Sequence, residues 1–369
     1  MKKYLSIIMI SALCLGCSYD KDELTDCVSD NSSEIISTRG SSETPIIEYF
    51  WRKENVMPDF DYMTHVIVSK AVFESPYDGT LKLKSGALKM AQLMDLKKKN
   101  NSDVKVILMV GGWGVDGFSQ IAKDNNKVKK FISNCSRLID SLHLDGIDID
   151  WEYPGNATSQ KIGYSSNDKE NLTKMMKTIR ETFDKYYKSH PKILSIDVSA
   201  NHPDYYDMKN LIKYVNYVNV MTYDMGEPPY HNSPLHSSPM TKSSCNTSIL
   251  SYISAGVPES QLVMGIPFYG HANGENSELK EDISYSAVKE LIKKDDKYTQ
   301  MWDDDACVPY LVWKGHSTNI CSFENASSIA DKCKYIKKKG LAGAMVWSYD
   351  HDDNEGTLRQ ALRKGLWNY

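Results

Sequence analysis

Short apolar segments recur along the chain from Pro45 onward, and longer amphipathic segments separate them. The apolar segments have the length of buried strands, and the amphipathic segments have the periodicity of helices. The segments that we predict as strands are 46–51, 65–73, 104–110, 146–152, 194–200, 217–223, 262–268 and 342–349. The segments that we predict as helices include 88–99, 128–142, 168–187 and 327–339. This alternation is typical of a (β/α)8 barrel, so we predict an α/β protein in which residues 45–369 form a single TIM-barrel domain.

A doubly wound open sheet is the other fold that alternating strands and helices form. That fold would need a glycine-rich loop for a phosphate group. The sequence contains neither a G-x-G-x-x-G motif nor a G-K-[ST] motif. The barrel is therefore the better interpretation.

The longest connection in the predicted barrel runs from Gly270 to about Glu324, after the seventh strand. We predict a modest insertion there, with a helix at 284–294 and a hairpin at 308–320. In a barrel, this connection emerges at the C-terminal end of the strands, where active sites lie. It therefore either builds one wall of a cleft or pads the rim.

The predicted strand at 146–152 carries the carboxylates of Asp148, Asp150 and Glu152 at every second position. Alternate side chains of a strand share one face, so the three acids point to one side and the apolar residues between them to the other. In a barrel wrapped by helices, the acids would face the interior. Glu152 ends the strand, at the position where barrel enzymes place catalytic groups. We interpret this segment as a catalytic strand.

Acids at alternate positions also occur in calcium loops, in solvated loops and in structural clusters. A calcium loop avoids large apolar residues between its ligands and needs a glycine near its middle. The spacers here are Ile147, Ile149 and Trp151, which favours a buried strand. Asp145 lies off the acidic face by parity, and we predict a structural role for it, satisfying backbone N–H groups. The histidines show no metal-binding pattern, so we predict no metal site.

Aromatic and acidic residues also end other predicted strands. Trp113 follows a glycine pair after the third strand. Tyr223 and Asp224 end the sixth strand, and Trp347 ends the eighth. The C-terminal ends of barrel strands meet at one rim, so we expect these side chains to lie together. Aromatic faces stack on sugar rings and carboxylates bond their hydroxyl groups, so this rim is typical of a sugar-binding cleft.

These motifs together resemble glycoside hydrolase family 18, the chitinase family. The central match is the D-x-x-D-x-D-x-E pattern of Asp145, Asp148, Asp150 and Glu152. The glycine pair before Trp113, the M-x-Y-D segment at 221–224 and the late Trp347 match three further family positions. The resemblance covers the chain from about Pro45 to the C-terminus. It implies a barrel-shaped glycosidase that needs no cofactor.

The resemblance implies a role for each acidic residue. Glu152 would be the general acid and base, and its pKa would be raised by the like charges that precede it. Asp150 would hold the acetamido N–H of the substrate, and Asp148 would share a proton with Asp150. Tyr223 would donate its hydroxyl to the acetamido oxygen.

The resemblance also implies which residues bind the sugar. Trp347 would form the floor of subsite −1, and Trp113 would stack on the leaving-group side. The full set of implied substrate-binding residues is Trp347, Trp113, Asp224, Met221, Tyr49 and Tyr153. Tyr49 matches the family less closely, because Glu48 stands where the family usually has glycine.

The spacing of the acids bears on the mechanism. A usual retaining glycosidase has a nucleophilic carboxylate about 5 Å from its acid. Asp150 lies roughly 7 Å from Glu152 along the strand and is badly placed to attack the opposite side of the sugar. Family 18 is an exception to the two-carboxylate scheme. The resemblance implies that the 2-acetamido oxygen of the substrate attacks C1 instead, through an oxazolinium ion and with retention.

The expected function is therefore endo-acting cleavage of β-1,4-N-acetylglucosaminide bonds in chitin or chitooligosaccharides. The Trp-Glu-Tyr-Pro sequence at 151–154 favours chitin. An endo-β-N-acetylglucosaminidase acting on N-glycan cores is the alternative within the family. A non-catalytic glycan-binding protein on the same barrel is less favoured, because the acid Glu152 is present. The connection after the seventh strand is shorter than the insertion that deepens the cleft in many processive relatives, so we predict a shallow groove and non-processive cutting. We also expect a monomer.

The N-terminal segment predicts export. Its apolar run, which ends at Gly16, is too short to span a bilayer and has the length of the hydrophobic region of a signal peptide. Gly16 before Cys17 resembles a bacterial lipoprotein signal, so we expect residues 1–16 to be removed and Cys17 to be lipidated. Residues 17–44 are polar and predict a flexible tether. We expect an outer-membrane or cell-surface lipoprotein that contacts the membrane only through its lipid, otherwise a periplasmic or secreted protein.

Charge and cysteine content exclude other classes of partner and site. The formal net charge is −4 and no long basic run occurs, so nucleic acid is not an expected partner. Of the eight cysteines, Cys14 and Cys17 belong to the predicted export segment, and the other six include no C-x-x-C pair, which argues against a zinc site. Their connectivity is not readable from the sequence. A bridge between Cys307 and Cys321, which flank the predicted hairpin, is one possible pairing.

Overall fold

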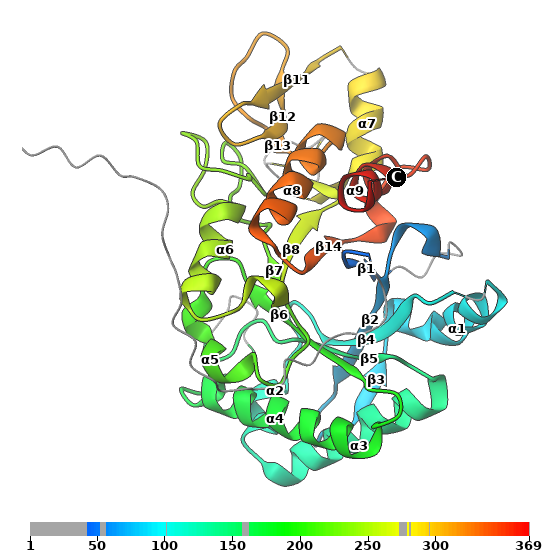
Figure 1. Ribbon diagram of the computed structural model, residues 1–369. Helices are drawn as coiled ribbons and strands as arrows, with labels where there is room; N and C mark the ends of the chain where they lie inside the picture. Colours follow the sequence, from blue (N-terminus) through cyan, green and yellow to red (C-terminus); the bar gives the residue numbers. More distant parts are fainter. Residues whose placement is uncertain are drawn as a thin grey trace, which may run out of the picture. The chain divides into compact units, whose positions relative to one another are not determined.

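Eight parallel strands close into a barrel in the computed structural model of the protein (Figure 1). Their order is β1-β14-β8-β7-β6-β5-β4-β2, and pairing of β1 with β2 closes the ring. This confirms the predicted (β/α)8 barrel. The strands are β1 (Ile46–Phe50), β2 (His65–Phe73), β4 (Lys105–Gly111), β5 (Gly146–Asp150), β6 (Ile193–Ser199), β7 (Tyr217–Met221), β8 (Leu262–Pro267) and β14 (Gly343–Trp347). A short strand, β3 (Leu81–Leu83), adds to β2 in antiparallel orientation.

The structure describes residues 43–51, 57–100, 102–156, 162–272, 279, 282–294 and 296–368. The predicted signal peptide at 1–16, the predicted lipidation site Cys17 and nearly all of the predicted tether at 17–44 lie outside these residues. Among the helices in the described ranges, none combines the length and the apolar character needed to cross a bilayer.

The predicted helices are present, with ends shifted by one to three residues. The α-helices are α1 (Met90–Lys99), α2 (Phe118–Ala122), α3 (Asn125–Leu142), α4 (Asp168–Tyr186), α5 (Met208–Leu211), α6 (Cys245–Ser254), α7 (Tyr285–Lys294), α8 (Ala326–Lys339) and α9 (Thr357–Trp367). The 3-10 turns are η1 (Phe60–Tyr62), η2 (Ser85–Lys89), η3 (Pro203–Tyr205), η4 (Glu259–Gln261) and η5 (Tyr349–His351). Local sequence explains the ends of α8: the Asn325 side chain caps its first N–H groups, and Gly340 ends it in the left-handed conformation.

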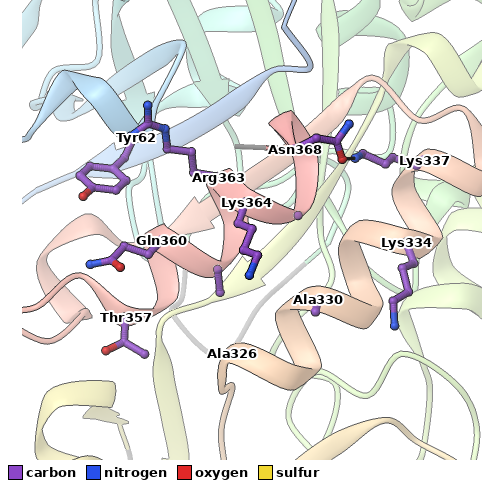
Figure 2. Close-up of a pocket in the computed structure, with 12 residues that line it drawn as sticks. Tyr62, Ala326, Ala330, Lys334, Lys337, Thr357, Gln360, Arg363, Lys364 and Asn368 are labelled. Atoms are coloured by element: carbon purple, nitrogen blue, oxygen red, sulfur yellow. Dashed lines mark hydrogen bonds between the residues drawn. The ribbon is translucent and has the colours of Figure 1, made fainter.

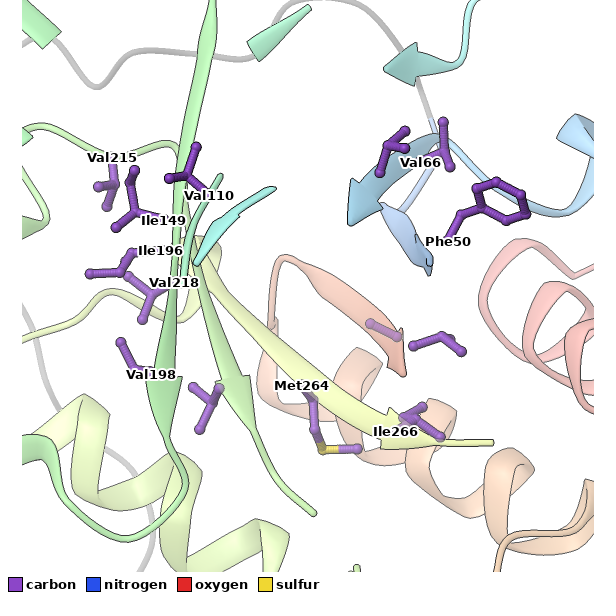
Figure 3. Packing of buried hydrophobic residues seen from close by; sticks show 14 of the residues in the cluster. Phe50, Val66, Val110, Ile149, Ile196, Val198, Val215, Val218, Met264 and Ile266 are labelled. Carbon is purple, nitrogen blue, oxygen red and sulfur yellow. The ribbon is translucent and has the colours of Figure 1, made fainter. Parts of the chain in front are cut away.

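The barrel strands divide their side chains between two faces. Outward-facing residues of successive strands, among them Val110, Ile149 and Ile196, pack in one hydrophobic core with the surrounding helices (Figure 3). On β5 this face also includes Ile147, and Trp151 beyond the strand stacks on Phe118 of α2 with ring centroids 5.2 Å apart. The acids of β5 lie on the opposite, inner face, as the alternation predicted.

The connection after β8 folds as a small antiparallel sheet with one helix. Its strands are β9 (Tyr269–Ala272), β10 (Asp282–Ser284), β11 (Tyr298–Asp303), β12 (Val308–Trp313) and β13 (Cys321–Ser322), in the order β10-β9-β13-β12-β11. The predicted helix is α7, and the predicted hairpin corresponds to β12 and β13. The sequence did not predict β11, because Thr299 and Gln300 interrupt its apolar pattern with exposed polar side chains.

One residue joins this insertion to the barrel. Phe268, fully buried, is the single residue between β8 and β9. Its N–H donates to the carbonyl of Trp347 at 2.8 Å, and its own carbonyl accepts from the N–H of Tyr285 at 3.1 Å. The last barrel strand, the insertion strand β9 and helix α7 therefore meet at one backbone position.

The cysteines in the described residues are free, so the bridge between Cys307 and Cys321 does not form. The pairing of β12 with β13 places Cys321 opposite Leu311. Cys307 precedes Leu311 by four positions, which corresponds to about 13 Å of extended chain. That separation exceeds the reach of a disulfide bond, whose Cα atoms lie less than about 7 Å apart.

Candidate active site

Asp148 lies at the bottom of the inner acidic face and is held by four other side chains. The Tyr49 hydroxyl contacts its Oδ2 at 3.0 Å, and Ser195 Oγ donates to its Oδ1 at 2.5 Å. Asn219 Nδ2 contacts Oδ1 at 3.4 Å, and the carboxyl of Asp197 is also hydrogen-bonded to Asp148. These partners come from β1, β6 and β7, so the centre of the barrel fixes the position of Asp148.

The carboxyl that is hydrogen-bonded to Asp148 among the described residues is that of Asp197, not that of Asp150. Burial raises the pKa of both carboxyls, and the charge of Asp148 raises the pKa of Asp197 further. The Tyr49 hydroxyl also bonds Asp197, at 2.6 Å. The predicted Asp148–Asp150 pair is not observed, because the two residues are separated along one strand whereas Asp197 reaches Asp148 from the neighbouring strand.

Asp150 lies above this network with an unsatisfied oxygen. Its Oδ1 is buried and has no hydrogen-bond partner among the residues that the structure describes. Burial raises the pKa of Asp150 well above its ordinary value, and the charges of Glu152 and Asp148 raise it further. A buried acceptor without a donor is costly, and such an atom commonly marks a functional position.

The backbone of Asp150 is packed closely against the glycine pair after β4. Gly112 N–H donates to the Asp150 carbonyl at 2.8 Å. Gly111 has a φ of +119°, and a Cβ atom at this position would lie 1.9 Å from the same carbonyl oxygen. Only glycine therefore allows β4 to approach the catalytic strand this closely.

Glu152 follows the end of β5 and is partly exposed. Its removal from water raises its pKa to about 7, and the charge of Asp224 also raises it. A hydrogen bond from Tyr153 and the charge of Lys70 act in the opposite direction. A carboxyl with a pKa near 7 holds a proton at mildly acidic pH and can release it, which is what a general acid requires.

Tyr223 reaches the same face from the end of β7. Its hydroxyl makes one hydrogen bond to a described residue, a weak one to the sulfur of Met345 at 3.8 Å. Burial and the surrounding carboxylates raise the pKa of Tyr223 well above its ordinary value, so the phenol remains a donor. Met221, two residues earlier, packs in the inner cluster beside it.

Asp224 is exposed and is positioned by two neighbours. The Tyr269 hydroxyl donates to its Oδ1 at 2.5 Å, and its backbone N–H donates to Asn232 Oδ1 at 2.7 Å. Its φ of +53° is unusual for a residue other than glycine. Tyr269 belongs to β9, so the insertion contributes directly to this side of the site.

The predicted aromatic residues lie in two groups. Trp347 is half-buried, 5.6 Å from the Tyr49 ring and stacked on Trp51 at 6.4 Å. Trp113 is 51% exposed and lies 6.4 Å from the Tyr153 ring. Tyr49 itself is buried beneath the acids. We predicted it as a substrate-binding residue, but its hydroxyl is engaged by Asp148 and Asp197, as described above, because the first strand directs it to the centre of the barrel.

Sequence reasoning missed the side chains that complete the acidic network, namely Asp197, Ser195 and Asn219. A signal for them exists in the sequence. On β6 polar residues alternate with apolar ones, and on β7 Asn219 lies between two valines, which is the same two-residue period that identified the acids of β5. Asp145 was predicted correctly as structural: its Oδ2 accepts from the N–H of Val106 at 2.8 Å.

A separate groove of about 920 Å³ lies between α8 and α9 (Figure 2). Basic side chains line it, namely Lys334, Lys337, Arg363 and Lys364, and no residue predicted for the site is among its lining residues. This groove is therefore distinct from the acidic site. Over the described part of the chain, no three His, Cys, Asp or Glu side chains are grouped so as to hold a metal ion.

Comparisons with known proteins agree with this geometry. The sequence model described as "Glycosyl hydrolases family 18" matches residues 41–352. Chitinase A1 of Niallia circulans is 29% identical over 306 residues, which cover 73% of this chain and 43% of that protein. Probable chitinase 2 of Drosophila melanogaster is 28% identical over 313 residues, covering 75% and 61%. The chain thus spans about half the length of these curated relatives.

A solved structure covers nearly the whole barrel. A family 18 N-acetylglucosaminidase from Paenibacillus barengoltzii superposes with a TM-score of 0.76 and is 27% identical in sequence. The match covers 88% of this chain and 100% of that one.

Proposed function

Because the chain belongs to glycosyl hydrolase family 18, we propose that it hydrolyses β-1,4 bonds after N-acetylglucosamine in chitin or chitooligosaccharides. The relatives named chitinases support this substrate class. We further propose endo action with retention of configuration, and non-processive cutting. The predicted export of the protein as a lipoprotein belongs to the same proposal, since a polymer outside the cell requires an enzyme outside the cell.

One observation carries the proposal. The inner face of the barrel has both a hydrogen-bond acceptor for the N–H of an acetamido group and a donor for its oxygen. Asp150 Oδ1 is a buried acceptor without a donor, and it suits an acetamido N–H. The Tyr223 hydroxyl is a donor with only a sulfur acceptor, and it suits an acetamido oxygen. An acceptor and a donor left unsatisfied in a buried site discriminate strongly against a ligand that lacks the matching groups.

The chemistry follows from this grip on the substrate. Tyr223 and Asp150 orient the acetamido group so that its oxygen forms a bond to C1 while the bond from C1 to the glycosidic oxygen breaks. Glu152 gives its proton to the departing oxygen. The acetamido N–H, held by Asp150, allows positive charge to spread over the oxazolinium ring. Water then attacks C1, Glu152 takes a proton from that water, and the acetamido oxygen is released, which gives net retention.

The remaining site residues have supporting roles in this proposal. Trp347 is the floor of subsite −1, and the exposed Trp113 is the platform on the leaving-group side. Asp224, positioned by Tyr269, accepts hydrogen bonds from the same sugar and opposes early ionisation of Glu152 through its charge.

The first experiment compares wild type with Glu152→Gln on chitotetraose and on a high-mannose glycoprotein. Glu181→Gln, an exposed change on α4, is the matched control. We expect cleavage of chitotetraose by wild type and by the control, and a loss of kcat in Glu152→Gln of 10²- to 10⁴-fold, about 3–5 kcal/mol of transition-state stabilisation.

The substrates separate the alternatives. Cleavage of the glycoprotein alone would replace the chitinase proposal with an endo-β-N-acetylglucosaminidase. Saturable binding without cleavage of either substrate would identify a non-catalytic glycan-binding protein. An N-acetylglucosamine thiazoline, in which sulfur replaces the acetamido oxygen of the oxazoline ring, should inhibit competitively. Lack of inhibition in an active enzyme would argue against attack by the acetamido group.

A further inference from the structure

A bulge in β2 turns a lysine toward the catalytic acids. Val68 pairs with Leu108 of β4, and the next pair is Ala71 with Val110. Three residue steps on β2 thus oppose two on β4, so β2 contains one extra residue. Before the bulge, even-numbered residues such as Val68 pack in the outer core, and after it the odd-numbered Ala71 does so. Lys70 therefore belongs to the inner face.

The position of the Lys70 side chain agrees with this change of parity. A Cβ atom built on Gly112 would lie 3.2 Å from Lys70 Nζ and 3.4 Å from its Cδ. The same built atom would lie 2.9 Å from Met109 Cε, and Met109 belongs to the inner cluster. Gly112 is also the residue whose N–H bonds the Asp150 carbonyl. The lysine thus extends across the glycine that contacts the catalytic strand.

Among the described residues, the other charged groups that act on Asp150 and Glu152 are carboxylates. The charge of Lys70 lowers the pKa of both Asp150 and Glu152. Its ammonium makes no ion pair within 4 Å of a described carboxylate, so it is not committed to one partner. The ionisable groups that face the two acids come from β1, β2, β5, β6 and the ends of β5 and β7, and they are Tyr49, Lys70, Asp148, Asp197, Tyr153, Tyr223 and Asp224.

We propose that Lys70 is a positioning residue that supplies the counter-charge of the Asp150–Glu152 pair and so favours the loss of one of the two protons that the pair can hold. Two adjacent buried carboxyls without a cation would hold two protons over a wide pH range. The acetamido N–H would then meet a protonated Asp150, which is a poorer acceptor than a carboxylate. Lys70 also stabilises the Glu152 carboxylate that forms when the proton leaves. The role of Lys70 in catalysis rests on the proposed function, whereas its electrostatic effect on Asp150 and Glu152 does not.

The test removes the charge while keeping the length of the side chain. Lys70→Met is compared with Lys70→Arg, which restores the charge, and with Lys82→Met. Lys82 lies on β3, is solvent-exposed and pairs with Glu74 at 2.9 Å, so it controls for loss of a nearby lysine. Circular dichroism and thermal unfolding show whether each variant is folded.

The first measurement is independent of activity. Carboxyl groups labelled with ¹³C are titrated by NMR, and the Glu152 and Asp150 resonances are assigned with Glu152→Gln and Asp150→Asn. We expect both midpoints to rise in Lys70→Met, by about one pH unit. They should return toward wild type in Lys70→Arg and stay unchanged in Lys82→Met. Unchanged midpoints in a folded Lys70→Met variant overturn the proposal.

The second measurement is the pH profile of kcat/KM on chitotetraose. Removing the cation raises both apparent pKa values of the pair, so both limbs of the profile should move to higher pH in Lys70→Met, and kcat should fall more than KM changes. If wild type cleaves nothing but the NMR midpoints shift, the proposed hydrolysis fails and the counter-charge stands. If wild type cleaves and the variant's profile is unmoved, only the role of Lys70 fails.

Discussion

Replacement of Glu48 should stabilise the protein relative to wild type, and this difference in stability should grow as the pH rises. Glu48 lies on β1 next to Tyr49, but it faces outward and is completely buried. Neither of its carboxyl oxygens has a hydrogen-bond partner in the structure. Burial raises its pKa from 4.5 to about 8, opposed by the charge of Arg359 and assisted by that of Asp352. The folded protein therefore holds Glu48 neutral at pH 7, whereas the unfolded chain ionises it.

The magnitude follows from linkage. Between pH 4.5 and about 8, the unfolded state loses the Glu48 proton and the folded state keeps it. Stability therefore falls as the pH rises, by about 1.4 kcal/mol per pH unit, and levels off above the folded-state pKa. The whole contribution of Glu48 is about 5 kcal/mol. Glu48→Gln removes this ionisation, and any cost of burying the amide is independent of pH.

The assay is urea unfolding of wild type and Glu48→Gln, followed by tryptophan fluorescence at pH 5, 6, 7 and 8. We expect the variant to gain stability over wild type by about 1 kcal/mol for each pH unit, with Glu181→Gln as an exposed control that shows no such trend. A difference between wild type and Glu48→Gln that stays constant from pH 5 to 8 would refute the reasoning, because it would mean that Glu48 ionises equally in both states.

Two further predictions concern close packing and a buried charge. Gly111→Ala places a methyl group against the carbonyl of Asp150 and should lower the free energy of unfolding by at least about 3 kcal/mol; Gly340→Ala, which also has positive φ but no neighbour within 4 Å, should cost about 1 kcal/mol. Equal costs in denaturant unfolding would show that the close approach is not the cause. Lys332→Met leaves the carboxylate of Glu324 buried without its partner and should cost about 3–5 kcal/mol, and adding Glu324→Gln should recover part of this. If the double variant is no more stable than the single one, the unpaired charge is not responsible.

The periodicity of single strands predicted the barrel and the inward acids because those features depend only on local alternation. Each predicted barrel strand agrees with the structure within two residues at each end; the largest differences are at 146–152, 217–223 and 342–349, whose last two residues lie beyond β5, β7 and β14. The chemistry of Glu152 was also accessible, since it lies at the end of an alternating acidic strand. These inferences needed no knowledge of how strands contact one another.

The features that were missed depend on contacts between strands. Asp197 becomes the hydrogen-bond partner of Asp148 only when β6 lies beside β5, and the family resemblance had implied Asp150 as its partner instead. By simple alternation along β2, Lys70 would face outward. The bulge between Val68 and Ala71 adds one residue and turns it inward, and this bulge depends on the pairing of β2 with β4. β11 carries too few apolar residues to be recognised alone, and it forms because β12 offers it a complete edge.

The junction at Phe268 sets two conditions on any insertion that is grafted onto this barrel. A transplanted insertion must bring its own N–H donor for the Phe268 carbonyl, a task that Tyr285 performs here, and it must leave the N–H of Phe268 for Trp347. An insertion that meets both demands keeps Tyr269, whose hydroxyl positions Asp224, linked through Phe268 to Trp347. The loop at 314–318, between β12 and β13, is exposed and is not part of this junction. We expect insertions and deletions to be tolerated in that segment, because they would leave the hydrogen bonds at Phe268 intact.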